Sequence, residues 1–136
     1  MKIVIGIGCD RGTPLKTLET ALAQALERID CEYDQIECFA TIDKKSDEDS
    51  INSLVKKRHK EIIYYPATEL AQVKVPNPSA VVMKYVGTPA VSEAAAILAA
   101  KTTMQDLLVE KLKYRGEDGK NATISVVCIT KNKEKE

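Results

Sequence analysis

A glycine-rich turn directly after an apolar segment is the first place where this chain can do chemistry. Residues 3–7 read Ile-Val-Ile-Gly-Ile, a pattern typical of a strand buried on both faces of a sheet. Gly8 and Gly12 allow positive φ and a close approach of the backbone to a ligand, and Thr13-Pro14 favours the start of a helix. A helix N-terminus presents free N–H groups and a partial positive charge, so this turn predicts an anion site. A tight turn without a ligand is the equally weighted alternative.

A second polar group follows the next apolar segment, residues 35–42. Thr41, Asp43 and Lys44 stand at or just after its end, and Asp43 is placed to act as a general base. Ligands of open α/β sheets bind at the carboxyl ends of strands. If the two strands run parallel, this group therefore lies at the same edge as the first turn.

Nucleotide binding is disfavoured by the glycine spacing. In Gly6-x-Gly8-x-x-x-Gly12, a dinucleotide fingerprint would need its third glycine where Arg11 stands. A phosphate-binding Walker loop would need a lysine before Thr13, and Gly12 precedes it instead.

The thiols and the single imidazole do not suggest a metal or cofactor site. The four cysteines form no C-x-x-C pair, and His59 lies in a basic run at the expected end of a helix. We expect no protein metal site and no cofactor, and we interpret the cysteines as idle thiols of a reducing cytosol. Cys9 is the exception, because a neighbouring helix N-terminus would lower its pKa.

Composition narrows the class of protein. The 136 residues carry 20 Lys and Arg against 20 Asp and Glu, so no net field favours nucleic acid or an anionic membrane. No apolar segment is long enough to span a bilayer, and Met1-Lys2 leads directly into the first strand. We therefore expect a cytoplasmic protein with one domain over residues 1–130 and a charged flexible tail over 131–136.

Apolar periodicity predicts the elements that position these groups. Helices are expected after Pro14, from an N-cap at Ser46, and over residues 68–73, 79–86 and 90–101. Strands are expected over residues 3–7, 35–42, 61–65, 107–109 and 122–130, the last two as an antiparallel hairpin. The order predicts an α/β fold: a three-layer α/β/α sandwich with a mixed, mostly parallel sheet of about five strands.

Four short segments follow one another along the chain: the G-x-G-C loop at residues 6–13, the A-T-x-D-x-K segment at 40–48, the V-x-N-P-S turn at 75–79 and the V-G-T-x-x-V-x-E-A-A-A segment at 86–96. Together they resemble the CobE/CbiG C-terminal domain family of cobalamin biosynthesis. Asp10 departs from the resemblance, since the family loop usually has a basic residue there. Arg11 is then the only cation of the turn, so an anion would depend more on the backbone N–H groups. Lys111 sits like the lysine of the family's terminal segment.

The resemblance implies a set of site residues. Asp43 would be the catalytic base, and eleven residues would bind substrate: Gly8, Cys9, Arg11, Gly12, Thr13, Thr41, Lys44, Gly87, Thr88, Glu93 and Lys111.

The resemblance also implies an activity. Full-length relatives open the δ-lactone of cobalt-precorrin-5A and release acetaldehyde, with cobalt arriving inside the substrate. The implied partners are a corrin or tetrapyrrole intermediate and other proteins of the pathway, or a separate N-terminal region. Two classes of function stay open: a lactone hydrolase or a subunit of one, and a non-catalytic tetrapyrrole carrier or partner-docking module.

Overall fold

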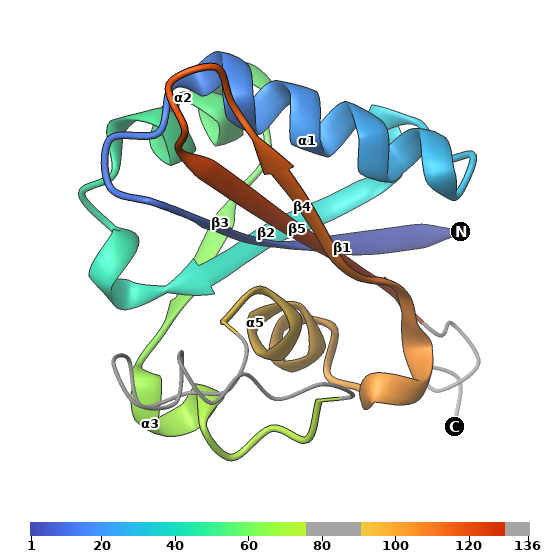
Figure 1. The fold of residues 1–136 in the computed structure, drawn as a ribbon. Coiled ribbons are helices and arrows are strands. Elements are labelled where there is room, and N and C mark those ends of the chain that lie inside the picture. The colour runs from blue at the N-terminus through green and yellow to red at the C-terminus, as the bar shows by residue number, and fades with distance from the viewer. Residues whose placement is uncertain (76–90, 130–136) are drawn as a thin grey trace.

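A five-stranded mixed sheet forms the centre of the molecule (Figure 1). The computed structural model describes residues 1–75 and 91–129. The strand order is β3-β2-β1-β5-β4, with β1–β2 and β2–β3 parallel and β1–β5 and β5–β4 antiparallel. This confirms the α/β fold with its C-terminal hairpin. The strands are β1 (Lys2–Cys9), β2 (Ile36–Ile42), β3 (Ile62–Tyr65), β4 (Leu107–Arg115) and β5 (Asn121–Ile129).

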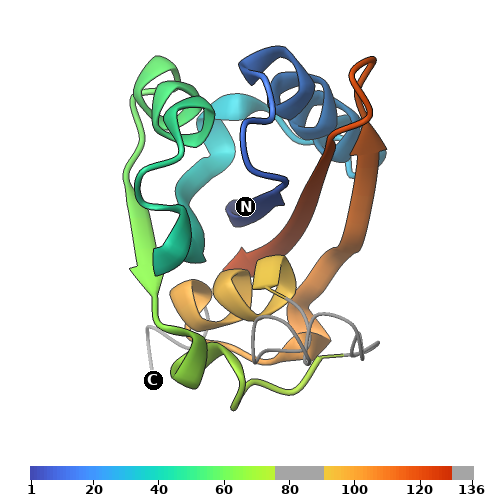
Figure 2. The same ribbon diagram turned by 60° about the vertical axis from the view of Figure 1, so that its left-hand side comes forward.

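Helices cover both faces of the sheet, as the three-layer prediction requires (Figure 2). Helices α1 (Leu15–Arg28) and α2 (Asp49–Lys57) lie on one face, and α3 (Ala67–Leu70) and α5 (Val91–Ala100) lie on the other. Each face has its own hydrophobic core. Strand β1 lies in the middle and is buried by both layers, which explains its unbroken apolar run. None of the helices within the described ranges is long and apolar enough to cross a membrane.

Helix α5 lies very close to β1 because β1 has a glycine at the crossing. A Cβ on Gly6 would stand 1.8 Å from the backbone oxygen of Ser92. The alanines at 94–96 are fully buried on the same helix. Gly6 therefore serves helix–strand packing, and the small residues of α5 pack closely as the sequence predicts.

The expected N-cap residues of the first two helices are wrong. Pro14, rather than Thr13, occupies the N-cap of α1, and Glu48, rather than Ser46, occupies that of α2. Residues 43–45 instead form a 3₁₀ turn, η2 (Asp43–Lys45), which the Ser46 N–H closes on the Asp43 oxygen at 3.0 Å. Neither N-cap residue accepts a side-chain hydrogen bond from the first turn of its helix.

Other boundaries shift or lie outside the described residues. Strand β4 runs six residues past the expected end at Val109, to Arg115, and α3 is shorter than expected. The expected helix over residues 79–86, the sites Gly87 and Thr88, and the tail over 131–136 lie outside the described ranges. Two further 3₁₀ turns, η1 (Tyr33–Gln35) and η3 (Met104–Asp106), precede β2 and β4.

Candidate functional site

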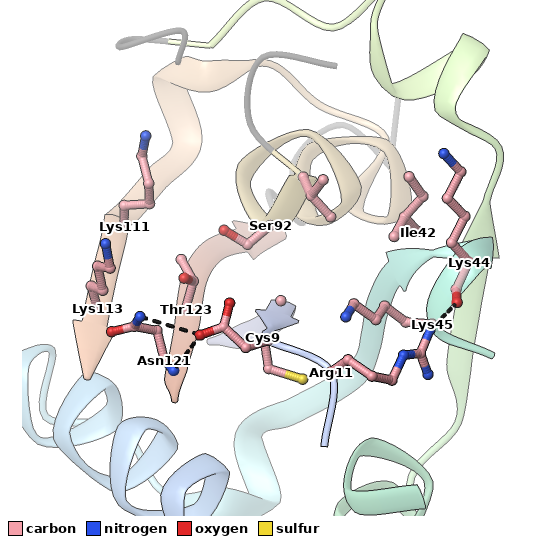
Figure 3. A pocket seen from close by; sticks show the side chains of 13 residues that line it. Cys9, Arg11, Ile42, Lys44, Lys45, Ser92, Lys111, Lys113, Asn121 and Thr123 are labelled. Carbon is pink, nitrogen blue, oxygen red and sulfur yellow. Dashed lines mark hydrogen bonds between the residues drawn. The ribbon is translucent and has the colours of Figure 1, made fainter. Parts of the chain in front are cut away.

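A pocket of about 510 Å³ lies where β1 and β2 end and α5 begins (Figure 3). Its wall includes Gly8, Cys9 and Arg11 from the first turn and Lys44 from the second. The parallel pairing of β1 with β2 brings these two loops together at one edge of the sheet, as the sequence predicts.

The described part of this pocket is strongly basic. Lys111 and Lys113 project from β4 on one side, and Arg11, Lys44 and Lys45 lie on the other (Figure 3). The single described carboxylate of the wall is Asp10, whose Oδ2 accepts hydrogen bonds from the backbone and side-chain nitrogens of Asn121 at 2.8 and 3.2 Å. The wall therefore has five cations and one engaged carboxylate, and three of the cations also lie within 4.0 Å of carboxylates outside the wall. The excess of cations in the wall suits a ligand that carries several carboxylates.

Gly8 leaves open space in the wall of the pocket. It lies in β1, and a Cβ built there would meet no heavy atom within 4 Å. Glycine allows positive φ at both positions, and Gly12 adopts it, at +79°, whereas Gly8 does not. Gly8 therefore contributes room for a ligand rather than an unusual backbone conformation.

Several main-chain donors of the first turn are already occupied by the protein itself. The N–H of Gly12 donates to Glu48 Oε2 at 3.1 Å, and the N–H of Thr13 donates to the Asp10 oxygen at 3.1 Å. The N–H of Asp10 donates to the Asn121 oxygen at 3.0 Å. These three groups support the loop, so the anion-binding capacity of the pocket rests on its side-chain cations.

Arg11 ties the two loops together. Its Nη1 lies 2.9 Å from Asp47 Oδ1 and 3.1 Å from Glu48 Oε1, and its Nη2 donates to the Lys44 oxygen at 3.1 Å. The hydrogen bond from Arg11 lowers the pKa of Asp47. The guanidinium therefore lines the pocket in a position that these three contacts fix.

The two predicted binding threonines hold the scaffold. The hydroxyl of Thr41 is fully buried and donates to the Ile7 oxygen at 2.6 Å, which joins β2 to β1. The hydroxyl of Thr13 donates to the Asp10 oxygen at 2.6 Å, and Thr13 is 1% exposed. Neither residue belongs to the pocket wall.

Asp43 does not join the pocket. It is exposed on η2 and is absent from the residues that line the cavity, although its neighbour Lys44 lines it. The structure thus brings together Gly8, Cys9, Arg11 and Lys44 and leaves the expected base outside this group.

The pKa of the Cys9 thiol shifts in the direction opposite to the one expected from the sequence. Burial raises the pKa of its thiol, and the nearby Lys45 only partly opposes this. The prediction of a lowered pKa for Cys9 is therefore wrong, because desolvation outweighs the neighbouring positive charge.

Glu93 and Lys111, predicted from distant segments, lie beside each other. Glu93 on α5 is fully buried, and its Oε1 is 4.0 Å from Lys111 Nζ, which belongs to the pocket wall. Burial raises the pKa of Glu93 to about 7; Lys111 acts against this rise and Glu110 adds to it. The basic wall thus has a buried acidic group behind it.

Sequence reasoning missed Lys45, Lys113, Ser92, Asn121 and Thr123 in the wall. Lys113 was detectable in principle, because alternate residues of a strand share a face and Lys111 was already assigned. It was lost because the expected strand stopped at residue 109.

Comparison with known proteins shows which family this chain resembles. The chain is 32% identical over 127 residues to a protein of Priestia megaterium named cobalt-precorrin-5A hydrolase, covering 93% of this chain and 32% of that one. It is 31% identical over 141 residues to a probable cobalt-precorrin-5A hydrolase of Methanocaldococcus jannaschii, covering 97% and 42% of the two chains. The chain therefore spans less than half the length of these relatives.

A solved structure has the same fold along almost the whole chain. The crystal structure of CobE, a protein from the cobalamin biosynthetic pathway, superposes with a TM-score of 0.76 at 25% identity and covers 95% of this chain and 92% of that one. The family model described as "Cobalamin synthesis G C-terminus" matches residues 3–127. The chain therefore belongs to the cobalamin synthesis G C-terminal family.

Proposed function

We propose that this protein binds a corrin-type intermediate of cobalamin biosynthesis by its carboxylate arms. The observation that carries the proposal is the basic pocket of about 510 Å³, with cations on two opposite sides and open space at Gly8. Membership of the family supports a role in the cobalamin pathway. Charge-assisted hydrogen bonds from lysine and arginine are the natural partners of ligand carboxylates.

The size of the pocket indicates how such a ligand sits. Pockets that enclose drug-sized ligands measure about 300–1,000 Å³. A corrin ring with its arms is larger than this cavity, so the pocket holds one edge of the ring and the remainder faces outward. A separate N-terminal region, of the kind that makes up the rest of the longer relatives, is the partner that would cover it.

Catalysis is the second candidate function, and the names of the two relatives favour it. Opening a lactone needs a nucleophilic water, a base and donors for the developing oxyanion. Because Asp43 lies outside the pocket wall and several turn N–H groups are engaged, binding has stronger support in this chain than lactone opening.

A spectral titration tests binding. The ligand is cobyrinic acid, a corrin with carboxylate arms, and its absorption spectrum should change when it binds the protein. Added salt should weaken the complex because the contacts are charged. Cobinamide, whose arms are amides, is the control ligand and should bind far more weakly. Lys113→Gln should reduce the affinity for cobyrinic acid, whereas Lys56→Gln, an exposed change outside the pocket, should not. Equal affinity for the two corrins would contradict the proposal.

A turnover assay decides between the two functions. Cobalt-precorrin-5A would be incubated with the chain alone and with the chain mixed with the N-terminal region of the Priestia megaterium relative, and acetaldehyde would be measured. Binding without acetaldehyde in both mixtures supports the carrier. If acetaldehyde forms, Asp43→Asn should abolish it and spare binding if Asp43 is the base; equal loss of both would contradict that role.

A further inference from the structure

Glu93 is a buried carboxyl group without a hydrogen bond. Its side chain is 0% exposed, and neither carboxylate oxygen has a hydrogen-bond partner among the described residues. An ionised carboxylate in such a place costs several kcal/mol unless a cation compensates it. The neutral, protonated form avoids this cost, so this site favours a carboxyl group that gains and loses a proton.

Lys111 lies between this carboxyl group and the pocket. Its Nζ is 4.0 Å from Glu93 Oε1, its side chain is 35% exposed, and it lines the pocket. The same ammonium group is therefore within reach of Glu93 on the buried side and of a ligand carboxylate on the open side. The two acids compete for one cation.

The other titratable groups around α5 do not replace this interaction. Lys111 and Glu110, both from β4, are the described charges that act on Glu93. Burial raises the pKa values of Cys38 and Tyr65 on β2 and β3, so both stay neutral near pH 7. The remaining carboxylates on elements that contact α5 are Glu37 of β2 and Glu69 of α3, which are exposed, and Asp106 of η3, which accepts a hydrogen bond from Thr102.

We propose that Glu93 is a positioning residue for ligand binding: it pairs with Lys111 in the empty pocket and takes up a proton when a ligand carboxylate pairs with Lys111. The proposal rests on the proposed function of the pocket as a carboxylate site. The proton comes from solvent and converts the carboxylate of Glu93 to a carboxylic acid, while Lys111 stays an ammonium ion throughout. The ligand thereby gains a cation without leaving an uncompensated buried anion behind it.

The direction of the pH dependence follows from linkage. A pKa of about 7 leaves Glu93 partly ionised at neutral pH, and a ligand anion at Lys111 raises that pKa further. The complex then holds more protons than the free protein between the two pKa values. Affinity therefore falls as the pH rises above about 7, by up to about tenfold per pH unit.

Calorimetry measures this proton directly. Cobyrinic acid would be titrated into the full chain at pH 7.5 in two buffers of different ionisation enthalpy, and the difference in heat gives the protons taken up. We expect a fractional uptake for the wild type and an uptake near zero for Glu93→Gln, which should bind at least as tightly and lose the pH dependence. Glu37→Gln, an exposed change on β2, is the matched control and should keep the uptake.

The possible outcomes separate the two proposals. Binding with no proton uptake in the wild type overturns the role of Glu93 and leaves the proposed function standing. Absence of binding overturns the proposed function and also the inference that a ligand carboxylate pairs with Lys111.

A titration without ligand tests the pair by itself. The carboxyl ¹³C resonance of Glu93 should shift with a midpoint near pH 7 in the wild type and at higher pH in Lys111→Met. A wild-type midpoint near the ordinary value of 4.5 would overturn the proposal, whether or not the corrin binds.

Discussion

The side-chain carboxylate of Glu48 accepts a hydrogen bond from the backbone N–H of Gly12 at 3.1 Å. The same carboxylate lies 3.1 Å from Arg11 Nη1 and is almost completely buried. An acidic group of the second loop thus occupies a position that the sequence suggests for a ligand anion at the first loop. This contact fixes the two loops against each other and so shapes one side of the pocket.

Glu48→Ala should lower the free energy of unfolding by about 1–3 kcal/mol, because it leaves the part-buried N–H of Gly12 without its acceptor and removes one of the two carboxylates paired with Arg11. Urea unfolding followed by circular dichroism measures this change. Asp47→Asn is the matched control: Asp47 pairs with the same arginine but its side chain is 78% exposed, so its loss should cost much less stability than the loss of Glu48. Equal losses would show that Glu48 has no special role in joining the loops.

Gly8→Val should block the ligand and spare the fold. The new side chain enters open space in the pocket wall, so corrin affinity should fall about tenfold or more while the free energy of unfolding changes by less than about 1 kcal/mol. Gly6→Ala should do the reverse, because its Cβ would overlap the Ser92 oxygen; we expect a destabilisation of about 3 kcal/mol or more. Thermal unfolding and the spectral titration measure both, and unchanged binding in Gly8→Val would remove Gly8 from the site.

The free energy of unfolding should fall as the pH rises from about 4.5 to about 7, because Glu93 loses its proton in this range. Its pKa is higher in the folded state, so the folded protein holds more protons in this window; the stabilisation is fully present below 4.5 and is lost through the folded pKa. The change should be on the order of 3 kcal/mol. Urea unfolding across pH 4–8 should show this fall in the wild type and not in Glu93→Gln. Parallel curves for the two proteins would contradict the raised pKa.

Thr41→Val should cost about 1–3 kcal/mol of stability and leave corrin affinity unchanged. The substitution keeps the shape of the side chain but removes the only hydroxyl that donates to the Ile7 oxygen among the described contacts. Chemical unfolding and the spectral titration measure the two effects. A tenfold loss of affinity in a folded variant would restore the binding role that the sequence suggests for Thr41.

The sequence by itself determined the layers of this protein. The apolar run of β1 and the regular apolar spacing of α1 are local signals, and the structure confirms both elements. The strand-to-helix order also predicted that the first two loops meet at one sheet edge, since parallel strands end on the same side. Gly8, Cys9, Arg11 and Lys44 were therefore placed together from their positions alone.

Only the tertiary structure decided which groups of that edge line the pocket. Gly12 and Thr41 have suitable donors, but contacts with residues more than thirty positions away, Glu48 and Ile7, use those donors internally. Lys113 entered the pocket because β4 extends through its pairing with β5. Hydrogen-bond donors and charges act on whatever lies within a few ångströms, and sequence spacing does not report distances across the sheet.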